Sequence, residues 1–117
     1  MPARAEVELD IFSGMPNPVW ILTDAEAASF VKKMAALSRT TATEISGKLG
    51  YRGFIVRLTE DAETHFIRVQ FGAVHVSKGT TNLYLKDEHR ELERWLLNSG
   101  RPHLESELWQ IADREFP

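Results

Sequence analysis

The sequence has no cysteine among its 117 residues. This absence excludes disulfide bonds, thiolate nucleophiles and every metal or iron–sulfur site that needs cysteine ligands. It also fits a reducing compartment, because disulfides persist mainly in oxidising ones. Catalysis by cysteine is therefore set aside from the start.

The chain also lacks long apolar runs and an excess of positive charge. No window approaches the ~20 apolar residues that a membrane-spanning helix needs, and the N-terminus has neither the basic start nor the apolar run of a signal peptide. Binding to a nucleic-acid backbone favours a strong basic excess, whereas the net charge here is −3. We therefore expect a soluble, cytoplasmic protein that binds neither membranes nor nucleic acids.

Motifs for metals, nucleotides and nucleophilic catalysis are missing as well. The four histidines are scattered along the chain, at positions 65, 75, 89 and 103, and none stands in an HExxH pattern. There is no P-loop, no GxGxxG and no GxSxG segment. The sequence thus predicts no catalytic residue, no metal and no cofactor, and it favours a binding function over an enzymatic one.

What is present is the composition of a folded domain. Hydrophobic residues make up 43% of the chain and charged residues 26%, which is near the average for globular proteins and far from that of disordered chains. A length of 117 residues is common for one domain, and no internal repeat or low-complexity tract divides the sequence. We therefore expect residues 1–117 to form a single domain.

The periodicity of apolar residues predicts a cluster of strands with helices at its ends. Val7, Leu9 and Ile11 alternate with acidic residues, which is typical of a half-buried strand. Thr23 and Glu26 form the capping-box pattern that begins a helix. The predicted strands cover residues 6–12, 19–22, 53–59, 65–71 and 73–77, and residues 81–86 form either another strand or an irregular crossing. The predicted helices cover residues 24–38, the segment from Asp87 to about Asn98 with Gly100 as its stop, and a segment after Pro102. Residues 38–50 are predicted to form a loop.

This order favours one fold class. Strands that cluster in sequence, with helices segregated at the ends, are typical of an antiparallel sheet and not of a doubly wound parallel one. We expect an α+β fold in which an antiparallel sheet of about four to six strands carries one helix from the N-terminal half and two C-terminal helices packed against it.

Two short segments are individual enough to suggest a relationship. Residues 12–20 read FSGMPNPVW, and residues 50–54 read GYRGF. This pair resembles a small family of bacterial proteins of unassigned function, which share an FSGxPNPxW segment and a GYRGF segment. The resemblance covers about a quarter of the chain. It implies a shared local structure and supplies no activity, cofactor or catalytic residue.

The same two segments form the first candidate binding surface. Two prolines near Ser13 and Asn17 restrict the backbone, and a rigid loop of this kind beside Trp20 is a reasonable platform for a partner. Tyr51 and Arg52 of the second segment complete the candidate surface. The alternative is structural: Ser13 and Asn17 bond the backbone of their own loop, and Trp20 anchors the core.

A second candidate site follows from strand pairing. If residues 61–64 form a four-residue loop, Arg57 lies opposite Arg68, and the bend after the next strand brings His75 alongside Arg68. Like charges in such a row are destabilising unless an anion neutralises them, and arginine grips carboxylate and phosphate well. Alternatively, the acidic residues of the first strand (Glu6, Glu8 and Asp10) pair with the row.

These candidates lead to two functional hypotheses. The first is a small non-catalytic interaction module that binds another protein, for example as a neutralising, immunity-type partner of a toxin or as an accessory regulator. The alternative is a protein that binds or acts on a small anionic ligand through Arg57, Arg68 and His75. The sequence sets neither the oligomeric state nor the identity of the partner.

Overall fold

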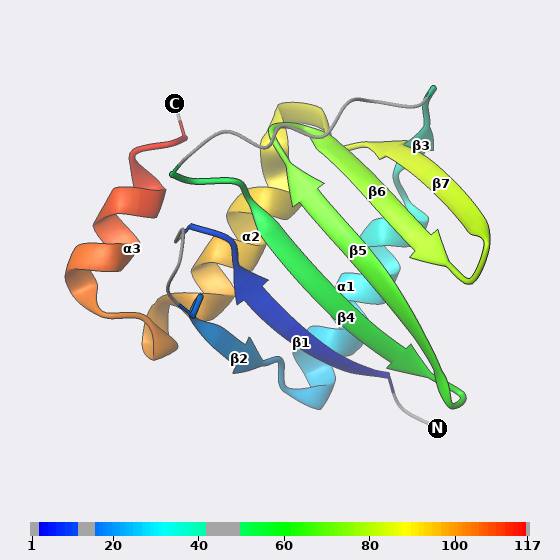
Figure 1. Ribbon diagram of the computed structural model, residues 1–117, viewed down its shortest axis with the longest axis horizontal. Coiled ribbons are helices and arrows are strands. Elements are labelled where there is room, and N and C mark those ends of the chain that lie inside the picture. Colours follow the sequence, from blue (N-terminus) through cyan, green and yellow to red (C-terminus); the bar gives the residue numbers. More distant parts are fainter. Residues whose placement is uncertain (1–2, 12–15, 42–49, 117) are drawn as a thin grey trace.

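A seven-stranded antiparallel sheet with helices on one side makes up the described part of the chain (Figure 1). The computed structural model describes residues 3–11, 16–41 and 50–116. The strand order is β2-β1-β4-β5-β6-β7-β3. The elements are β1 (Arg4–Leu9), β2 (Val19–Ile21), α1 (Asp24–Ala35), β3 (Ser38–Arg39), β4 (Phe54–Glu60), β5 (Glu63–Gln70), β6 (Ala73–Lys78), β7 (Thr81–Lys86), η1 (Glu88–Arg90), α2 (Glu91–Gly100), η2 (Arg101–His103) and α3 (Ser106–Asp113).

The predicted fold class is confirmed, with one difference in the strand number. The additional strand, β3, lies where a loop was predicted, and it pairs Ser38 with Lys86 and Arg39 with Leu85 at the edge of the sheet. Both of its side chains are exposed, so it has none of the alternation that reveals a half-buried strand. Backbone pairing alone defines it, and the sequence carries no signal for that.

The core lies between the sheet and the helices. Alternate residues of the central strands point toward α1 and α2, as the period of two requires. Each such side chain contributes roughly 1.5–3 kcal/mol relative to exposure. The fully buried members of this core include Val7, Leu9, Phe30, Phe54, Val56, Leu58, Ile67, Val69, Leu96 and Leu97.

The start of α1 confirms the predicted capping box. The backbone N–H of Glu26 donates to Thr23 Oγ1 over 3.1 Å, and Glu26 Oε1 accepts from the Thr23 N–H over 2.8 Å. These bonds satisfy donors that the first turn of a helix leaves free. The helix ends at Ala35, three residues before the predicted end, and the chain then turns into β3.

The hairpin between β4 and β5 overturns part of the predicted register. Its turn has two residues, Asp61 and Ala62, with φ angles of 47° and 67°, and not the four that were expected. Arg57 therefore lies opposite Phe66, and the predicted pairing of Arg57 with Arg68 is wrong. Turn length sets the register of a hairpin, and a left-handed alanine at such a position is not signalled by the sequence. The other predicted neighbours, Arg68 and His75, do face each other.

The entry into α2 is irregular. Asp87 was predicted as its cap, and its carboxylate accepts from the N–H groups of Leu92 (2.8 Å) and Glu93 (3.0 Å) across the short η1 turn. His89 and Arg90 lie in the left-handed region, each with φ of 56°. Burial raises the pKa of Asp87 above its ordinary value, although the two N–H groups act in the opposite direction.

Gly100 has a different role from the predicted helix stop. Its backbone is right-handed helical, and the chain continues directly into η2. A Cβ at this position would lie 2.4 Å from the ring of Trp20. The glycine is therefore required for the close approach of α2 and β2, not for a left-handed turn.

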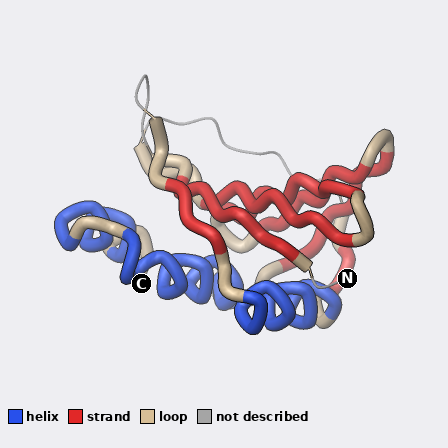
Figure 2. The backbone as a smooth tube through the Cα atoms, turned by 90° about the horizontal axis from the view of Figure 1, so that it is seen from below, coloured by secondary structure: helices blue, strands red, loops and turns tan. Residues whose placement is uncertain are grey.

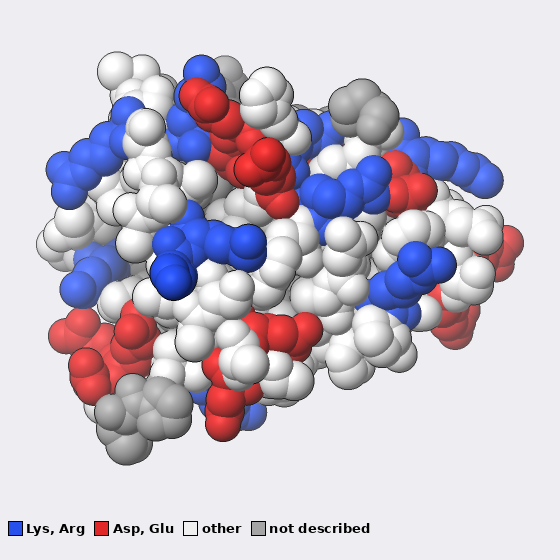
Figure 3. All heavy atoms as spheres, turned by 180° about the vertical axis from the view of Figure 1, so that it is seen from behind, with Lys and Arg blue, Asp and Glu red and all other residues white. Residues whose placement is uncertain are grey.

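The last helix, α3, contacts α2 and extends past the end of the sheet (Figure 2). Only Ala112 is buried within it. Positive and negative side chains are interspersed over the helix-bearing face of the molecule, so this face has no extended patch of one sign (Figure 3). In the described residues, no helix has the length and apolar character needed to cross a membrane.

Candidate functional site

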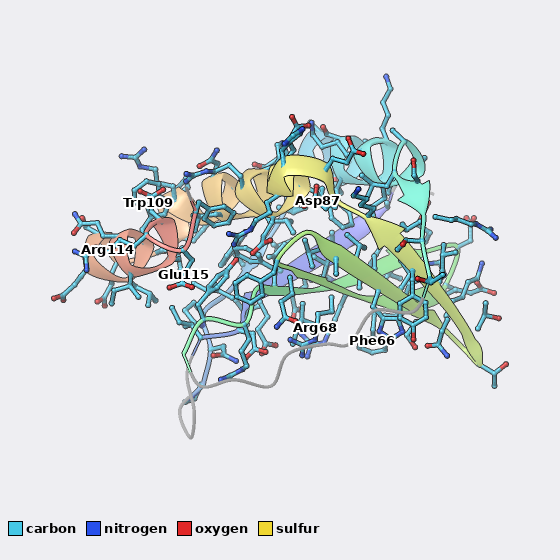
Figure 4. The ribbon with its side chains drawn as sticks, turned by 90° about the horizontal axis from the view of Figure 1, so that it is seen from above. Phe66, Arg68, Asp87, Trp109, Arg114 and Glu115 are labelled. Atoms are coloured by element: carbon cyan, nitrogen blue, oxygen red, sulfur yellow. The ribbon has the colours of Figure 1, made fainter. Side chains whose placement is uncertain are left out.

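The two motif segments meet at Asp10, which follows β1 and is 7% exposed. Arg52 donates to Asp10 Oδ1 from Nε (3.1 Å) and Nη2 (2.8 Å). Arg68 donates to the other oxygen, Oδ2, over 2.9 Å. Figure 4 shows Arg68 on the face of the sheet opposite the helices. One carboxylate thus joins the segment before β4 to β5, and the group Asp10, Asn17, Arg52, Arg68 and Gln70 is called the Asp10 cluster below.

Asn17 ties the proline segment to the same cluster. Its Oδ1 accepts from the Ile11 N–H over 3.1 Å, and its Nδ2 donates to Glu8 Oε2 over 2.9 Å and to Asp10 Oδ1 over 3.4 Å. Bonding of this kind within a turn matches the structural alternative for Asn17. Ser13, the other candidate binding residue of this segment besides Asn17 and Trp20, lies outside the described residues.

Backbone bonds complete the connection between β1 and the segment before β4. The Arg52 N–H donates to the Asp10 carbonyl over 2.8 Å, and the Asp10 N–H donates to the Gly53 carbonyl over 2.9 Å. The Arg52 carbonyl accepts from Gln70 Nε2 over 3.0 Å. The two segments therefore share one hydrogen-bonded junction.

The charge on Asp10 is stabilised by its partners. Burial alone would raise the pKa of this carboxyl, but the hydrogen bonds and positive charges of Arg52 and Arg68 outweigh burial and hold the pKa below its ordinary value. Since the folded state favours the ionised form, the cluster stabilises the fold at neutral pH and loses this contribution as the pH falls.

An Asp10→Asn variant is expected to lose about 2 kcal/mol of unfolding free energy at neutral pH, because two arginines lose an ionised acceptor. The difference from wild type should shrink as the pH falls below ~3.9, where the unfolded wild-type chain takes up the proton. Urea unfolding at neutral and acidic pH measures both values. Asp24→Asn, at an exposed position in α1, is the control and should lose less than ~1 kcal/mol. A difference that is independent of pH would contradict the assignment.

Trp20 and Tyr51 belong to the core and not to an exposed surface. Each is 4% exposed. Trp20 Nε1 donates to Ser99 Oγ over 3.1 Å, and its ring stacks on His103 with 6.4 Å between centroids. The Tyr51 hydroxyl bonds Glu93 in the interior. Trp20 therefore anchors the core, as the structural alternative to a binding role predicted.

A buried ionic cluster around Glu93 was not anticipated. Glu93 is fully buried, and it accepts from Arg90 Nε over 3.1 Å and from Arg90 Nη2 over 2.9 Å. Burial, followed by the charge of Glu93, raises the pKa of Tyr51, and the hydrogen bond with Glu93 raises the pKa of Arg90. A signal was present in the sequence: Glu93 precedes Leu96 and Leu97 by one helical turn, so it lies on the inward face.

Arg90 also holds the end of the chain. Its Nη1 donates to the Glu115 carbonyl over 2.6 Å. Its guanidinium lies over the rings of Phe71, at 5.1 Å, and Phe116, at 4.2 Å. These contacts fasten the segment after α3 to the start of α2, and the cluster therefore has a structural role.

The predicted basic row lies on one face of the sheet, but carboxylates accompany it. Arg57 Nη1 lies 3.4 Å from Glu6 Oε1 and 3.2 Å from Glu8 Oε1. Arg68 pairs with Asp10 over 2.9 Å. The prediction of an anion rested on repulsion within the row, and these pairs remove that reason.

His75 completes the row and forms no ion pair with a carboxylate of the described residues. Its Nε2 lies 2.9 Å from Asn82 Oδ1, and its ring stacks on Tyr84 with 4.8 Å between centroids. Both contacts link β6 to β7 on the open face of the sheet. Within the described residues, no group of three or more histidine, aspartate and glutamate side chains could hold a metal ion.

A groove with a volume of 540 Å³ lies between the proline segment and α3. We call it the proline–α3 groove. Its described lining consists of Pro16, Asn17, Pro18, His103, Leu104, Glu105, Glu107, Leu108 and Ile111. The volume is in the range of small-ligand and peptide pockets. One wall is rigid, because prolines restrict its backbone and Asn17 is held by the Asp10 cluster.

The chemistry of this groove is apolar with an acidic rim. Leu104, Leu108 and Ile111 form one wall, and Ile111 is 45% exposed. Glu105 and Glu107 are exposed at the rim, and neither forms an ion pair within the described part of the chain. Its lining contains neither lysine nor arginine among the described residues. The sequence predicted both the proline segment and a helix after Pro102, but not that the two lie side by side, because only the tertiary fold brings them together.

Comparisons with known proteins do not add to this description. The sequence matches no protein-family model and no curated protein, and the fold matches no solved structure.

Proposed function

We propose that this chain is a non-catalytic protein-interaction module and that the proline–α3 groove is its contact surface. The observation that carries the proposal is an apolar wall beside the proline segment, with Leu104 and Leu108 half-buried and Ile111 exposed. Leu108 and Ile111 belong to a helix that extends past the sheet. Exposed apolar surface of this kind marks interaction sites in soluble proteins. A neutralising partner of a toxin and an accessory regulator would both use such a surface.

The two arginine-paired carboxylates of the interior are not placed for catalysis. Asp10 and Glu93, which are buried carboxylates, are each paired with arginine, and neither lines the groove. A general acid or base needs access to a reacting atom. A small anionic ligand at Arg57 and Arg68 would have to displace Glu6, Glu8 and Asp10, so no observation favours that alternative.

The test compares two substitutions of the same kind. Ile111→Arg places a charge in the apolar wall, whereas Ile21→Arg places one at an equally exposed isoleucine on β2, since the two are 45% and 42% exposed. Wild-type protein and both variants are used as bait in a lysate of the producing cells, and retained proteins are quantified by mass spectrometry. We expect a partner that wild type and Ile21→Arg retain and that Ile111→Arg retains ~30-fold less.

Two results would contradict this function. One is equal retention by Ile111→Arg and wild type, and the other is equal loss with both arginine variants. Thermal unfolding of each variant shows whether the fold is intact, so that a loss of capture is not confused with a loss of structure.

A further inference from the structure

We propose that the proline–α3 groove receives a segment that carries a lysine or arginine close to a bulky apolar side chain. The inference rests on the proposed function, because it names the chemistry of the partner that would occupy that same groove. It follows from three observations: the apolar wall, the acidic rim and the distribution of charge over the rest of the molecule.

The apolar wall requires a bulky apolar side chain from the partner. Leu108 and Ile111 are three residues apart on α3 and share one face of the helix. Leu104, in the extended segment between η2 and α3, lines the same groove. Pro16 and Pro18 face these side chains across the groove. A polar side chain would lose its hydration here without gaining a partner.

The acidic rim favours a cation in the partner. Glu105 precedes α3 without making a side-chain cap bond, and Glu107 lies in the first turn. Both are exposed and form no ion pair within the described residues, whereas several other carboxylates of the molecule are paired with arginine. With two carboxylates and neither lysine nor arginine in its described lining, the groove is complementary to positive charge.

The charge complementarity between the acidic rim and a partner cation acts only at short range. The net charge is only −3, and charges of both signs are mixed over the helix-bearing face (Figure 3). Salt screens exposed charges beyond about 8–10 Å, so the rim acts on a cation that is already in the groove. Glu105 and Glu107 therefore orient a segment that is already bound, and they do not attract it from a distance.

The spacing of the two features restricts the partner further. Glu107 and Ile111 are four residues apart on α3, which places their Cβ atoms about 6 Å apart. An extended partner matches this distance with side chains two residues apart, and a helical partner matches it with side chains three or four apart. The predicted motif is thus a lysine or arginine at one of these separations from a bulky apolar residue.

The experiment selects ligands from a library of short random peptides displayed on phage, with the full chain as target. Selected peptides are synthesised, and their affinities are measured by fluorescence anisotropy at low and high salt. We expect the predicted motif to be enriched and affinity to fall as salt rises. Glu105→Lys/Glu107→Lys should weaken binding ~10-fold. Glu88→Lys/Glu91→Lys makes the same charge change at exposed positions outside the groove, so its affinity should stay within about twofold of wild type.

The possible outcomes separate the two proposals. Peptides that need Ile111 but are neutral or acidic would overturn the inference and leave the interaction module in place. A library that yields only peptides indifferent to Ile111→Arg, or no peptide at all, would overturn both. A dimer in sedimentation that Ile111→Arg dissociates would identify a second copy as the occupant and would also overturn the inference.

Discussion

A Glu93→Ala variant is expected to lose about 4 kcal/mol of unfolding free energy, a large part of the stability of a domain of this size. The variant removes the carboxylate that accepts two hydrogen bonds from Arg90 and one from Tyr51. The Arg90 guanidinium, whose side chain is 19% exposed, would remain without a counter-charge. Urea unfolding followed by circular dichroism measures the loss.

The surface pair Arg94–Asp113 provides the matched control. Both side chains are 37% exposed, so Arg94→Ala should cost no more than ~1 kcal/mol. A second control is the triple variant Tyr51→Phe/Arg90→Met/Glu93→Leu, which replaces the buried charges and the Tyr51 hydroxyl by apolar groups and should recover most of the loss. A cost for Glu93→Ala no larger than that of Arg94→Ala would show that the buried pair does not hold the end of the chain.

Gly53→Ala is expected to cost at least ~3 kcal/mol, because two unfavourable effects coincide. The backbone of Gly53 has a φ of 84°, which side chains rarely adopt. A Cβ would also lie 2.1 Å from the Val69 carbonyl oxygen and 3.0 Å from Gln70 Cα. Relief of this clash would shift the neighbouring strand β5 and would disturb Arg52, the adjacent member of the Asp10 cluster.

Gly50→Ala isolates the contribution of the clash. Gly50 has the same φ of 84°, but a Cβ there would meet no atom of the described residues within 4 Å. Its expected cost is therefore the conformational one alone, about 1–2 kcal/mol. Thermal and urea unfolding of both variants give the comparison, and equal costs at the two glycines would refute a role for the contact with Val69.

Local signals were enough to predict most of the elements. The alternation around Val7 and Leu9 marked β1, and the pattern of Thr23 and Glu26 marked the start of α1, because both depend on neighbours in sequence. Of the two alternatives left open for residues 81–86, a strand or an irregular crossing, the strand is the one that forms, as β7. The α+β class followed from the order of these elements.

The candidate site was harder to predict, because it depends on contacts between distant segments. The register of Arg57 depended on one turn, in which Ala62 adopts a left-handed conformation against its preference. Asn17 and Arg52 were selected as exposed binding groups, but Asp10 draws both into a junction. The groove is lined by residues 16–18 and by residues between 103 and 111. No periodicity in the sequence indicates that these two segments lie side by side.

The position of β1 between β2 and β4 also has a consequence for synthesis on the ribosome. β1 pairs with β4 along its whole length, from Arg4 with Thr59 to Leu9 with Phe54. At translation rates of about 5–20 residues per second, roughly 2–10 s pass between the emergence of the two strands. During that interval one edge of β1 has no partner, and such an edge is a template for aggregation. The acidic residues Glu6 and Glu8 keep the nascent strand from pairing with other chains, before they come to face Arg57 in the finished sheet.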